Sequence, residues 1–289
     1  MIKALIKSMR PKQWAKNVFI LAALVFDRQL TNPSALIKTL IGFILFCLLS
    51  SAVYLINDIA DIEADKQHPT KRNRPIASGK LPKNIAIAAA VVFVIVTIPS
   101  GIFLAPEFAI IAALYFLLNL AYSQILKHIP IIDVLVLASF YVIRVIAGVC
   151  LIQVERFSPW LYVCTTLLAL FIGLGKRRAE LTLAIETGNS HRRVLDGYTI
   201  PFLDQLITIV SSTTIISYSL YTFFAPSLPQ NHAMMLTIPF VLYAIFRYLY
   251  LVQVKNMGGA PEDVLFADKP ILAAIMLWGL SVLINFYLF

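Results

Sequence analysis

Residues 35–65 read ALIKTLIGFILFCLLSSAVYLINDIADIEAD and decide the fold. Residues 35–56 form an apolar run, and about 20 such residues suffice for a helix to cross the hydrocarbon core of a bilayer. This run passes without a turn signal into Asn57, Asp58, Asp61 and Asp65. Ionisable groups next to a membrane span are costly and usually serve a function. The stretch therefore predicts a membrane helix that ends in a functional carboxylate cluster.

The composition of the whole chain agrees with a membrane protein. Hydrophobic residues make up 60% of the 289 residues and charged residues only 13%. Soluble globular domains carry about 45–50% apolar and about 25% charged residues. The apolar excess cannot fit inside a water-soluble core, which excludes soluble, disordered and fibrous proteins. The three cysteines lie in apolar runs, so we expect no disulfide framework.

The apolar runs predict an all-α integral membrane protein with nine transmembrane helices, in a single polytopic domain covering residues 1–289. Ala105-Pro106 separates the third and fourth runs, which predicts a tight helical hairpin. The predicted spans are residues 14–29, 35–56, 84–104, 106–125, 132–152, 159–175, 202–224, 232–252 and 270–288.

The loop charges predict an orientation. With the N-terminus placed in the cytoplasm, 19 of the 24 Lys and Arg residues fall on the cytoplasmic side and three on the opposite side. Cytoplasmic loops are enriched in Lys and Arg. The N-terminus and the long loops at about 57–83 and 176–201 are therefore expected in the cytoplasm of a multi-pass cell-membrane protein. The net charge of +9 also suits phosphorylated substrates. A nucleic-acid partner is not indicated, because no basic stretch is interleaved with stacking aromatic residues in a soluble module.

The spacing of the acidic cluster points to a metal. On a helix, residues three and four positions apart share a face, so Asn57, Asp61 and Asp65 form one stripe with Asp58 beside it. Carboxylates on one face repel unless cations bind, and hard oxygen ligands select Mg²⁺. We therefore expect Asn57, Asp58, Asp61 and Asp65 to hold Mg²⁺. The alternative is an acidic helix end that is merely solvated.

A basic segment follows the acidic one. Residues 68–79 read HPTKRNRPIASG, with Lys71, Arg72 and Arg74 as the cations. Carboxylates for a metal followed by cations for phosphate form a layout suited to a Mg²⁺-bound diphosphate. We expect the prolines to end the helix and let the loop fold back.

A second basic cluster follows the sixth predicted span. Residues 175–181 read GKRRAEL, and Glu180 lies on the same helical face as Lys176. Three consecutive cations also stop membrane transfer and complement a helix C-terminus, which is the alternative interpretation. The substrate-binding candidates of this region are Lys176, Arg177, Glu180, Arg192 and Tyr198.

A third basic segment opens the first predicted span. Residues 10–17 read RPKQWAKN, and Lys12, Lys16 and Asn17 are substrate-binding candidates. An interfacial anchor around Trp14 explains the same residues. Arg144 lies near the middle of the fifth predicted span and should face the bundle interior. A structural role and a cavity-lining role for Arg144 both remain open.

The motif Asn57-Asp58-x-x-Asp61-x-x-x-Asp65, at the end of the second of nine predicted helices, resembles the UbiA superfamily of intramembrane prenyltransferases. The resemblance covers essentially the whole chain and implies that this motif binds Mg²⁺ and a diphosphate. Most members carry a second Asp-x-x-x-Asp motif after the sixth helix, where residues 176–181 here read KRRAEL. This departure argues against ordinary aromatic prenylation.

Five further segments resemble one branch of the superfamily, the decaprenyl-phosphate phosphoribosyltransferases. The matching segments are residues 10–17, 68–79, 175–181, 192–195 and 261–265. The branch implies Mg²⁺-dependent transfer of a 5-phosphoribosyl group from phosphoribosyl pyrophosphate to a polyprenyl phosphate, in the synthesis of cell-wall polymers. Asp58, Asp61 and Asp65 would be the catalytic residues.

Two other functions are compatible with the sequence. The first is a polyprenyltransferase that moves a prenyl group from a prenyl diphosphate to an aromatic acceptor such as 4-hydroxybenzoate. The second is a transporter, but transporter sites lie near the bilayer midplane between broken helices. The acidic cluster here lies at the membrane edge, which favours the enzyme.

Overall fold

The computed structural model describes residues 1–67, 71–152, 159–187, 193–225, 231–255 and 267–287, together with Leu228, Met257 and Val264. These residues form helices joined by turns, and no strand occurs among them. The chain folds as two compact units. The N-terminal unit comprises Met1–Gln124 and Ile143–Glu155, and the C-terminal unit comprises Ile125–Val142 and Arg156–Phe289.

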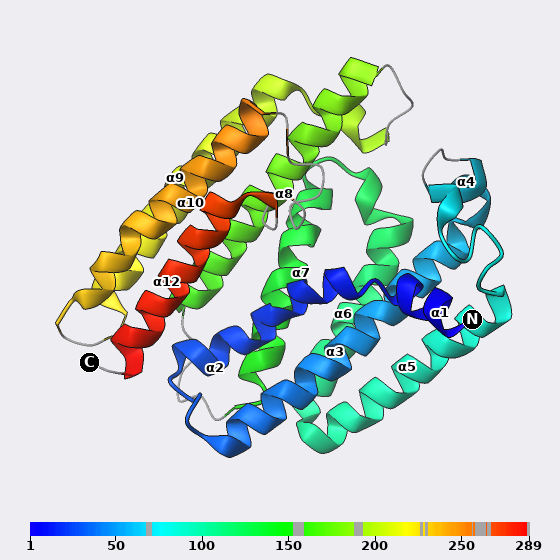
Figure 1. Cartoon of the computed structure of the whole chain (residues 1–289), viewed down its shortest axis with the longest axis horizontal. Coiled ribbons are helices and arrows are strands. Elements are labelled where there is room, and N and C mark those ends of the chain that lie inside the picture. Colours follow the sequence, from blue (N-terminus) through cyan, green and yellow to red (C-terminus); the bar gives the residue numbers. More distant parts are fainter. Residues whose placement is uncertain are drawn as a thin grey trace. The chain divides into compact units, whose positions relative to one another are not determined.

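The N-terminal unit is built on three long helices that run side by side, α3, α5 and α6 (Figure 1). Asn32 starts α3, because its side-chain oxygen accepts hydrogen bonds from the backbone N–H groups of Ser34 and Ala35 and Pro33 fits the first helical turn. The elements are α1 (Ile2–Met9), the 3-10 helix η1 (Pro11–Leu21), α2 (Ala22–Phe26), α3 (Pro33–Ala60), α4 (Ile62–Gln67), the 3-10 helix η2 (Lys71–Asn73), α5 (Lys83–Leu104), α6 (Pro106–Gln124) and the second half of α7 (Ile132–Val149).

A small apolar core fixes the loop after η2 to the ends of α3 and α5. Ile76 and Leu81 from the loop are buried together with Leu55 of α3 and Ala86 of α5. Burying a Leu or Ile side chain stabilises a fold by about 1.5–3 kcal/mol. The basic segment is thereby held against the helix end that carries the acidic cluster.

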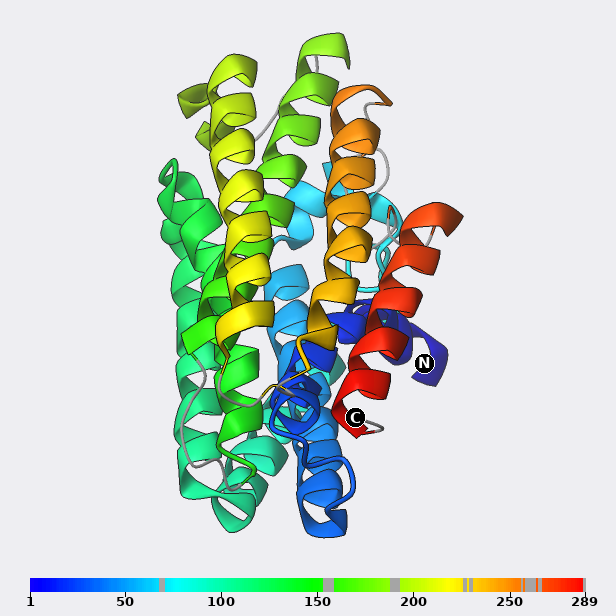
Figure 2. The ribbon, with the colours of Figure 1, turned by 90° about the vertical axis from the view of Figure 1, so that its left-hand side faces the viewer.

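The C-terminal unit is a bundle of α8, α9, α10 and α12, whose long axes run in the same general direction in Figure 2. Its core joins Phe171 and Leu174 of α8 with Leu203 of α9, Tyr248 of α10 and Ile271 of α12. The elements are η3 (Leu126–His128), the first half of α7, α8 (Pro159–Thr187), η4 (Arg193–Gly197), α9 (Ile200–Phe224), η5 (Ala233–Thr237), α10 (Ile238–Gln253) and α12 (Lys269–Tyr287).

Eight helices of the described chain are long and apolar enough to span a membrane, and they match eight of the nine predicted spans. The first predicted span, residues 14–29, differs: it consists of η1 followed by the short helix α2. Polar Asn17 interrupts its apolar surface and is buried in hydrogen bonds to α3. The predicted hairpin is confirmed, because Ala105 alone separates α5 from α6.

Helix α8 extends well beyond the span predicted for it. The predicted sixth span ends at residue 175, whereas α8 continues to Thr187 and carries Lys176, Arg177 and Glu180 on its last turns. The helix can continue because carboxylates neutralise its arginines: Arg177 and Arg178 each form an ion pair with a carboxylate. The second basic cluster therefore lies largely on a helix rather than in a loop.

Candidate active site

Two buried carboxylates of the predicted acidic cluster meet at one guanidinium. Nη1 of Arg74 donates to Oδ1 of Asp58 over 3.1 Å and to Oδ2 of Asp65 over 2.7 Å. The Asp58 and Asp65 side chains are only 3% and 4% exposed. The chain runs almost without interruption from α3 through Asp61 into α4, which brings positions 58 and 65, two turns apart, to the same side. We call these two residues the Asp58–Asp65 pair.

Arg10 contributes a second cation to this pair. Its Nη2 donates to Oδ1 of Asp58 over 2.5 Å, and its guanidinium lies 4.8 Å from the centre of the Tyr54 ring. Arg10 ends α1 in a left-handed backbone conformation, with φ 54°, which turns the chain into η1. Charge-assisted hydrogen bonds of this kind are stronger than neutral ones. The N-terminal segment is therefore connected to the end of α3.

Asn57 and Asp61, the other two predicted metal ligands, have different surroundings. Oδ1 of Asn57 accepts a hydrogen bond from the Ser123 hydroxyl over 2.7 Å, whereas Asp61 is exposed where α3 ends. Within the described ranges, no three His, Cys, Asp or Glu side chains lie close enough together to hold a metal ion. The structure thus joins two of the four predicted ligands around one cation.

The donor chemistry of the Asp58–Asp65 pair nevertheless fits magnesium. Mg²⁺ is usually held by one or two carboxylates, with waters and substrate phosphate oxygens completing its coordination. Asp58 and Asp65 supply two hard oxygen ligands that already converge on a cation, the Arg74 guanidinium. The pair therefore has the ligand type and number that a Mg²⁺-bound diphosphate requires.

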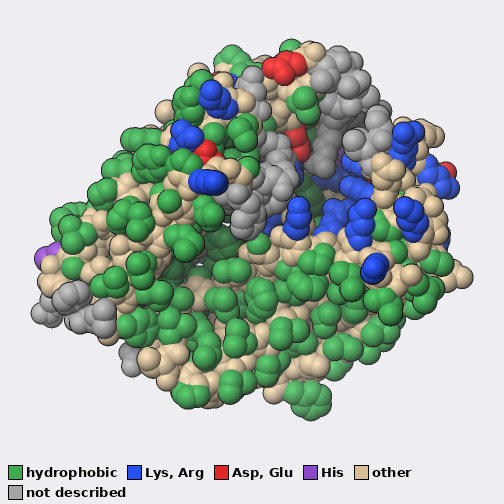
Figure 3. Space-filling model, viewed as in Figure 1, with side chains coloured by type: hydrophobic (Ala, Val, Ile, Leu, Met, Phe, Trp, Pro, Cys, Tyr) green, Lys and Arg blue, Asp and Glu red, His purple; other side chains and the backbone are tan. Residues whose placement is uncertain are grey.

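Other predicted cations of the N-terminal unit belong to η1, which contacts α3, and to η2, which contacts α4. Lys71 and Arg72 belong to η2, where Lys71 is half-buried and Arg72 is exposed. In η1, Lys12 is exposed and Lys16 is half-buried. Figure 3 shows Lys and Arg side chains gathered over the part of this unit that α1 and α4 form, whereas its surface along α3 and α5 is mainly hydrophobic. The cations are concentrated where the carboxylates lie.

Asn17 belongs to a second, fully buried polar cluster of the N-terminal unit. Nε of Arg144 donates to Oδ1 of Asn17 over 2.8 Å, and Nη2 of Arg144 donates to the Tyr115 hydroxyl over 2.9 Å. The Asn17 amide in turn donates to the Ser50 hydroxyl over 3.2 Å. Arg144 thus faces the interior, as predicted, and joins η1, α3, α6 and α7. In the structure Asn17 holds helices together, and its predicted contact with substrate stays a prediction.

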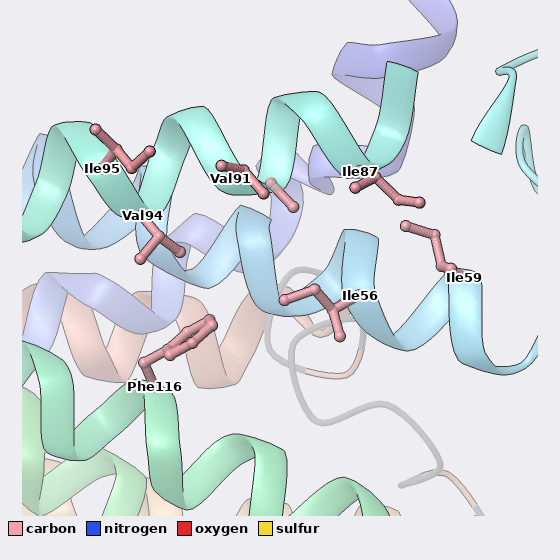
Figure 4. Close-up of a pocket in the computed structure, with 8 residues that line it drawn as sticks. Ile56, Ile59, Ile87, Val91, Val94, Ile95 and Phe116 are labelled. Atoms are coloured by element: carbon pink, nitrogen blue, oxygen red, sulfur yellow. The ribbon is translucent and has the colours of Figure 1, made fainter. Parts of the chain in front are cut away.

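An apolar groove of about 370 Å³ lies between α3, α5 and α6 (Figure 4). One end of the groove lies at Ile59, the residue after Asp58, and the other end lies at Ile95 on α5 (Figure 4). A groove without polar lining groups suits a hydrocarbon chain. The lining residues are Ile56, Ile59, Ile87, Ala90, Val91, Val94, Ile95 and Phe116.

The second basic cluster contains a buried ion network within the C-terminal unit. Arg177 donates from Nε to Oδ2 of Asp133 and from Nη1 to Oε2 of Glu180, each over 2.6 Å. The Tyr198 hydroxyl donates to Oδ1 of Asp133 and accepts from the backbone N–H of Ile131, each over 2.6 Å. Burial, together with donation to the Asp133 carboxylate, raises the pKa of Tyr198 well above its usual value.

The remaining predicted residues of this cluster have separate positions. Lys176 is half-buried on α8, and Arg192 lies outside the described residues. Arg178 donates to Asp204 of α9 over 2.6 Å and to the backbone carbonyl of Val252 over 3.1 Å. Arg177 and Arg178 are therefore both bonded to carboxylates of neighbouring helices.

Three contacts of the candidate site residues were not predicted from the sequence. Arg10 and Ser123 contact Asp58 and Asn57, and Asp133 holds Arg177. The sequence Arg10-Pro11 indicates a turn, but nothing in it indicates that Arg10 forms an ion pair with Asp58. Asp133 is 44 residues from Arg177 in sequence, so no local spacing could reveal their contact.

Comparison with known proteins finds relatives over nearly the whole chain. The model of the UbiA prenyltransferase family matches residues 17–266. Decaprenyl-phosphate phosphoribosyltransferase of Mycobacterium tuberculosis is 35% identical over 282 residues, covering 96% of this chain and 92% of the relative. The enzyme of the same name from Corynebacterium glutamicum is 35% identical over 295 residues, covering 98% and 87%.

Solved structures share the fold. A UbiA homolog from Archaeoglobus fulgidus bound to GPP and Mg²⁺ superposes with a TM-score of 0.73 at 17% identity, over 97% of this chain and 99% of that one. At this level of identity the likeness concerns the fold. The helices of this chain therefore follow an architecture that other chains share.

Proposed function

The chain belongs to the UbiA prenyltransferase family and is a membrane transferase, and we propose that it transfers a 5-phosphoribosyl group from phosphoribosyl pyrophosphate to a polyprenyl phosphate. The transfer would require Mg²⁺. Residues 1–289 would form one polytopic membrane domain with its N-terminus in the cytoplasm. The observation that carries it is the Asp58–Asp65 pair surrounded by cations of the N-terminal unit. Relatives that bear the corresponding name, at 35% identity over nearly the whole chain, support it.

Asp58 and Asp65 would hold Mg²⁺ against the donor diphosphate, with Asn57 and Asp61 as further oxygen ligands. When bound, the metal neutralises the diphosphate as it leaves. Arg10 and Arg74 are already placed at the two carboxylates, and Lys71 and Arg72 follow on η2. Their cationic groups bind phosphate oxygens and hold the donor in one orientation.

The reaction replaces one bond at ribose C1 by another. An oxygen of the acceptor phosphate attacks C1, and the bond from C1 to the diphosphate oxygen breaks, so that pyrophosphate leaves with the bonding electrons. Positive charge develops at C1 as the leaving group departs. The acceptor phosphate is anionic at neutral pH and needs no general base. Positioning and charge stabilisation therefore supply most of the acceleration.

The two substrates make different demands on the chain. Phosphoribosyl pyrophosphate brings a diphosphate and a 5-phosphate, and the lipid acceptor brings a third phosphate group. We assign Lys12, Lys16, Lys176 and Arg192 to these additional phosphates. Arg177, Glu180 and Tyr198 keep Lys176 on an ordered helix through the Asp133 network. The isoprenoid tail of the acceptor would lie in the apolar groove that begins at Ile59.

A direct assay tests the proposal. Purified protein in lipid nanodiscs is offered radiolabelled phosphoribosyl pyrophosphate with decaprenyl phosphate and, separately, 4-hydroxybenzoate with a polyprenyl diphosphate. We expect a labelled lipid product from the first pair, which disappears when EDTA removes Mg²⁺. Product from the second pair alone would show the alternative aromatic prenyltransferase. Product in the presence of EDTA would remove the metal from the mechanism.

A further inference from the structure

One guanidinium nitrogen contacts both members of the Asp58–Asp65 pair. Nη1 of Arg74 lies 3.1 Å from Oδ1 of Asp58 and 2.7 Å from Oδ2 of Asp65. A divalent cation bridging the pair would use the same side-chain oxygens. We propose that Arg74 competes with the divalent metal for these carboxylates, so that the metal binds tightly only together with the donor diphosphate. This inference rests on the proposed function and adds a coupling between the two ligands.

The charges of the cluster explain the coupling. Asp58 and Asp65 carry two negative charges, and Arg10 and Arg74, which contact them, carry two positive charges. A divalent cation that bound alone would leave an uncompensated double positive charge next to two nearly buried carboxylates, and uncompensated charge in such a place is costly. A diphosphate brings several negative charges, which offset the metal and give both guanidinium groups a new partner.

Burial shows which groups can move. The carboxylates are 3% and 4% exposed, whereas the Arg74 and Arg10 side chains are 28% and 31% exposed. The backbone around Arg74 is fixed, because its N–H donates to the carbonyl of Lys71 and its carbonyl accepts from the N–H of Ser78. Rotation of the Arg74 side chain toward solvent would therefore release Oδ2 of Asp65 and remove one of the two guanidinium contacts of Asp58, without unfolding the loop. The same guanidinium can then bind the incoming diphosphate.

The two arginines should differ in how strongly they compete with a bridging metal. Arg74 bridges Asp58 and Asp65. Of these two carboxylates, Arg10 contacts that of Asp58. Removing Arg74 breaks the bridge and releases Oδ2 of Asp65, while Arg10 stays on Oδ1 of Asp58. Removing Arg10 leaves the Arg74 bridge in place. Competition with a bridging metal therefore predicts a larger effect for Arg74→Gln than for Arg10→Gln. A general loss of positive charge would affect metal binding equally in both.

The experiment measures metal binding rather than turnover. The full chain in nanodiscs is titrated with Mn²⁺, followed by electron paramagnetic resonance of free Mn²⁺, with and without inorganic pyrophosphate. Without pyrophosphate, we expect Arg74→Gln to bind Mn²⁺ about tenfold more tightly than the wild type, a typical size for coupling between two sites. Pyrophosphate should tighten Mn²⁺ binding strongly in the wild type and much less in Arg74→Gln.

Two variants serve as controls. Lys66→Gln removes an exposed cation next to Asp65 in sequence that is bonded to Glu63 instead, so its Mn²⁺ affinity should match that of the wild type. Arg74→Lys keeps the competing charge and should bind Mn²⁺ weakly in the absence of pyrophosphate. If Arg74→Gln does not fold, as judged by its melting temperature, Arg74→Lys still tests the proposal: tight Mn²⁺ binding without pyrophosphate would contradict it.

Failure of this inference is distinguishable from failure of the proposed function. Equal Mn²⁺ affinity in the wild type and in Arg74→Gln, with binding lost in Asp65→Asn, would overturn the competition and leave the metal site intact. Absence of Mn²⁺ binding in all variants, even with pyrophosphate, would overturn both the inference and the metal role in the proposed function.

Discussion

Arg177 and Asp133 form an ion pair of 2.6 Å in which the two side chains are 1% and 0% exposed. The pair joins α8 to the start of α7. Each partner has further hydrogen bonds, from Arg177 to Glu180 and from Tyr198 to Asp133. A buried ion pair is tolerated only when hydrogen bonds satisfy its remaining polar atoms. This network is therefore what allows α8 to carry a row of cations into the last turns of the helix.

Breaking this pair from one side should be costly. Asp133→Asn leaves the Arg177 guanidinium buried opposite a neutral amide, and removal of one partner of a buried pair typically costs about 3–5 kcal/mol. We expect a clearly lower melting temperature in detergent, followed by tryptophan fluorescence. The double variant Asp133→Leu/Arg177→Met removes both charges and should recover much of that loss. A double variant less stable than Asp133→Asn would show that the network is stabilising as a whole.

Tyr198 should make the protein sensitive to alkaline pH. Burial and the bond to Asp133 raise the pKa of Tyr198 in the folded state above its value in the unfolded chain. The folded state then holds this proton more tightly, so the stabilisation is present below the ordinary tyrosine pKa of about 10 and is lost as the pH rises above it. In a series of melting temperatures from pH 8 to pH 11, Tyr198→Phe should decline less steeply than the wild type. Parallel curves would contradict this origin of the alkaline sensitivity.

Gly148 is required by close packing between α7 and η1. A Cβ atom at this position would overlap the backbone carbonyl oxygen of Ile20, which cannot move as a flexible side chain could. Small residues let membrane helices approach closely, and overpacking costs about 1–3 kcal/mol. We therefore expect Gly148→Ala to lower the melting temperature. Gly279→Ala is the matched control, because a Cβ at this position in α12 meets no atom within 4 Å; equal losses in both variants would contradict the packing argument.

The long helices could be predicted from the sequence because a bilayer requires long apolar segments, and eight such segments stand out. The first predicted span was the exception. Lys16 and Asn17 lie inside its run, and Asn17 turns inward to contact Ser50 and Arg144 rather than marking a helix end. The polarity of a residue in the sequence does not show whether that residue is buried in a polar contact or lies at the end of a membrane span.

The composition of the candidate site could be predicted, but its pairings could not. The spacing of Asp58, Asp61 and Asp65 placed carboxylates at the end of α3, and a basic loop followed. Which loop cation would reach Asp58 depends on how the chain turns before Pro75 and packs Ile76 into the core. That packing selects Arg74, and the left-handed backbone at Arg10 adds a partner from a segment 48 residues away.

Asp58 and Asp61 differ in burial, and this difference separates their roles in activity and stability. Both are proposed metal ligands, so Asp58→Asn and Asp61→Asn should each lower kcat by about 10²–10³, the typical cost of removing one group that stabilises developing charge. Asp58 is buried against Arg10 and Arg74, so Asp58→Asn should also lower the melting temperature. Asp61 is exposed, so Asp61→Asn should melt like the wild type.

The measurements are kcat at saturating substrates, the Mg²⁺ concentration for half-maximal rate, and the melting temperature of each variant. Glu63→Gln is the control, because Glu63 is an exposed carboxylate of the same segment that is bonded to Lys66. It should keep wild-type values for all three quantities, because its carboxylate is no part of the proposed site. Undiminished turnover in Asp61→Asn would remove Asp61 from the ligand set and leave the Asp58–Asp65 pair to hold the metal with substrate oxygens and water.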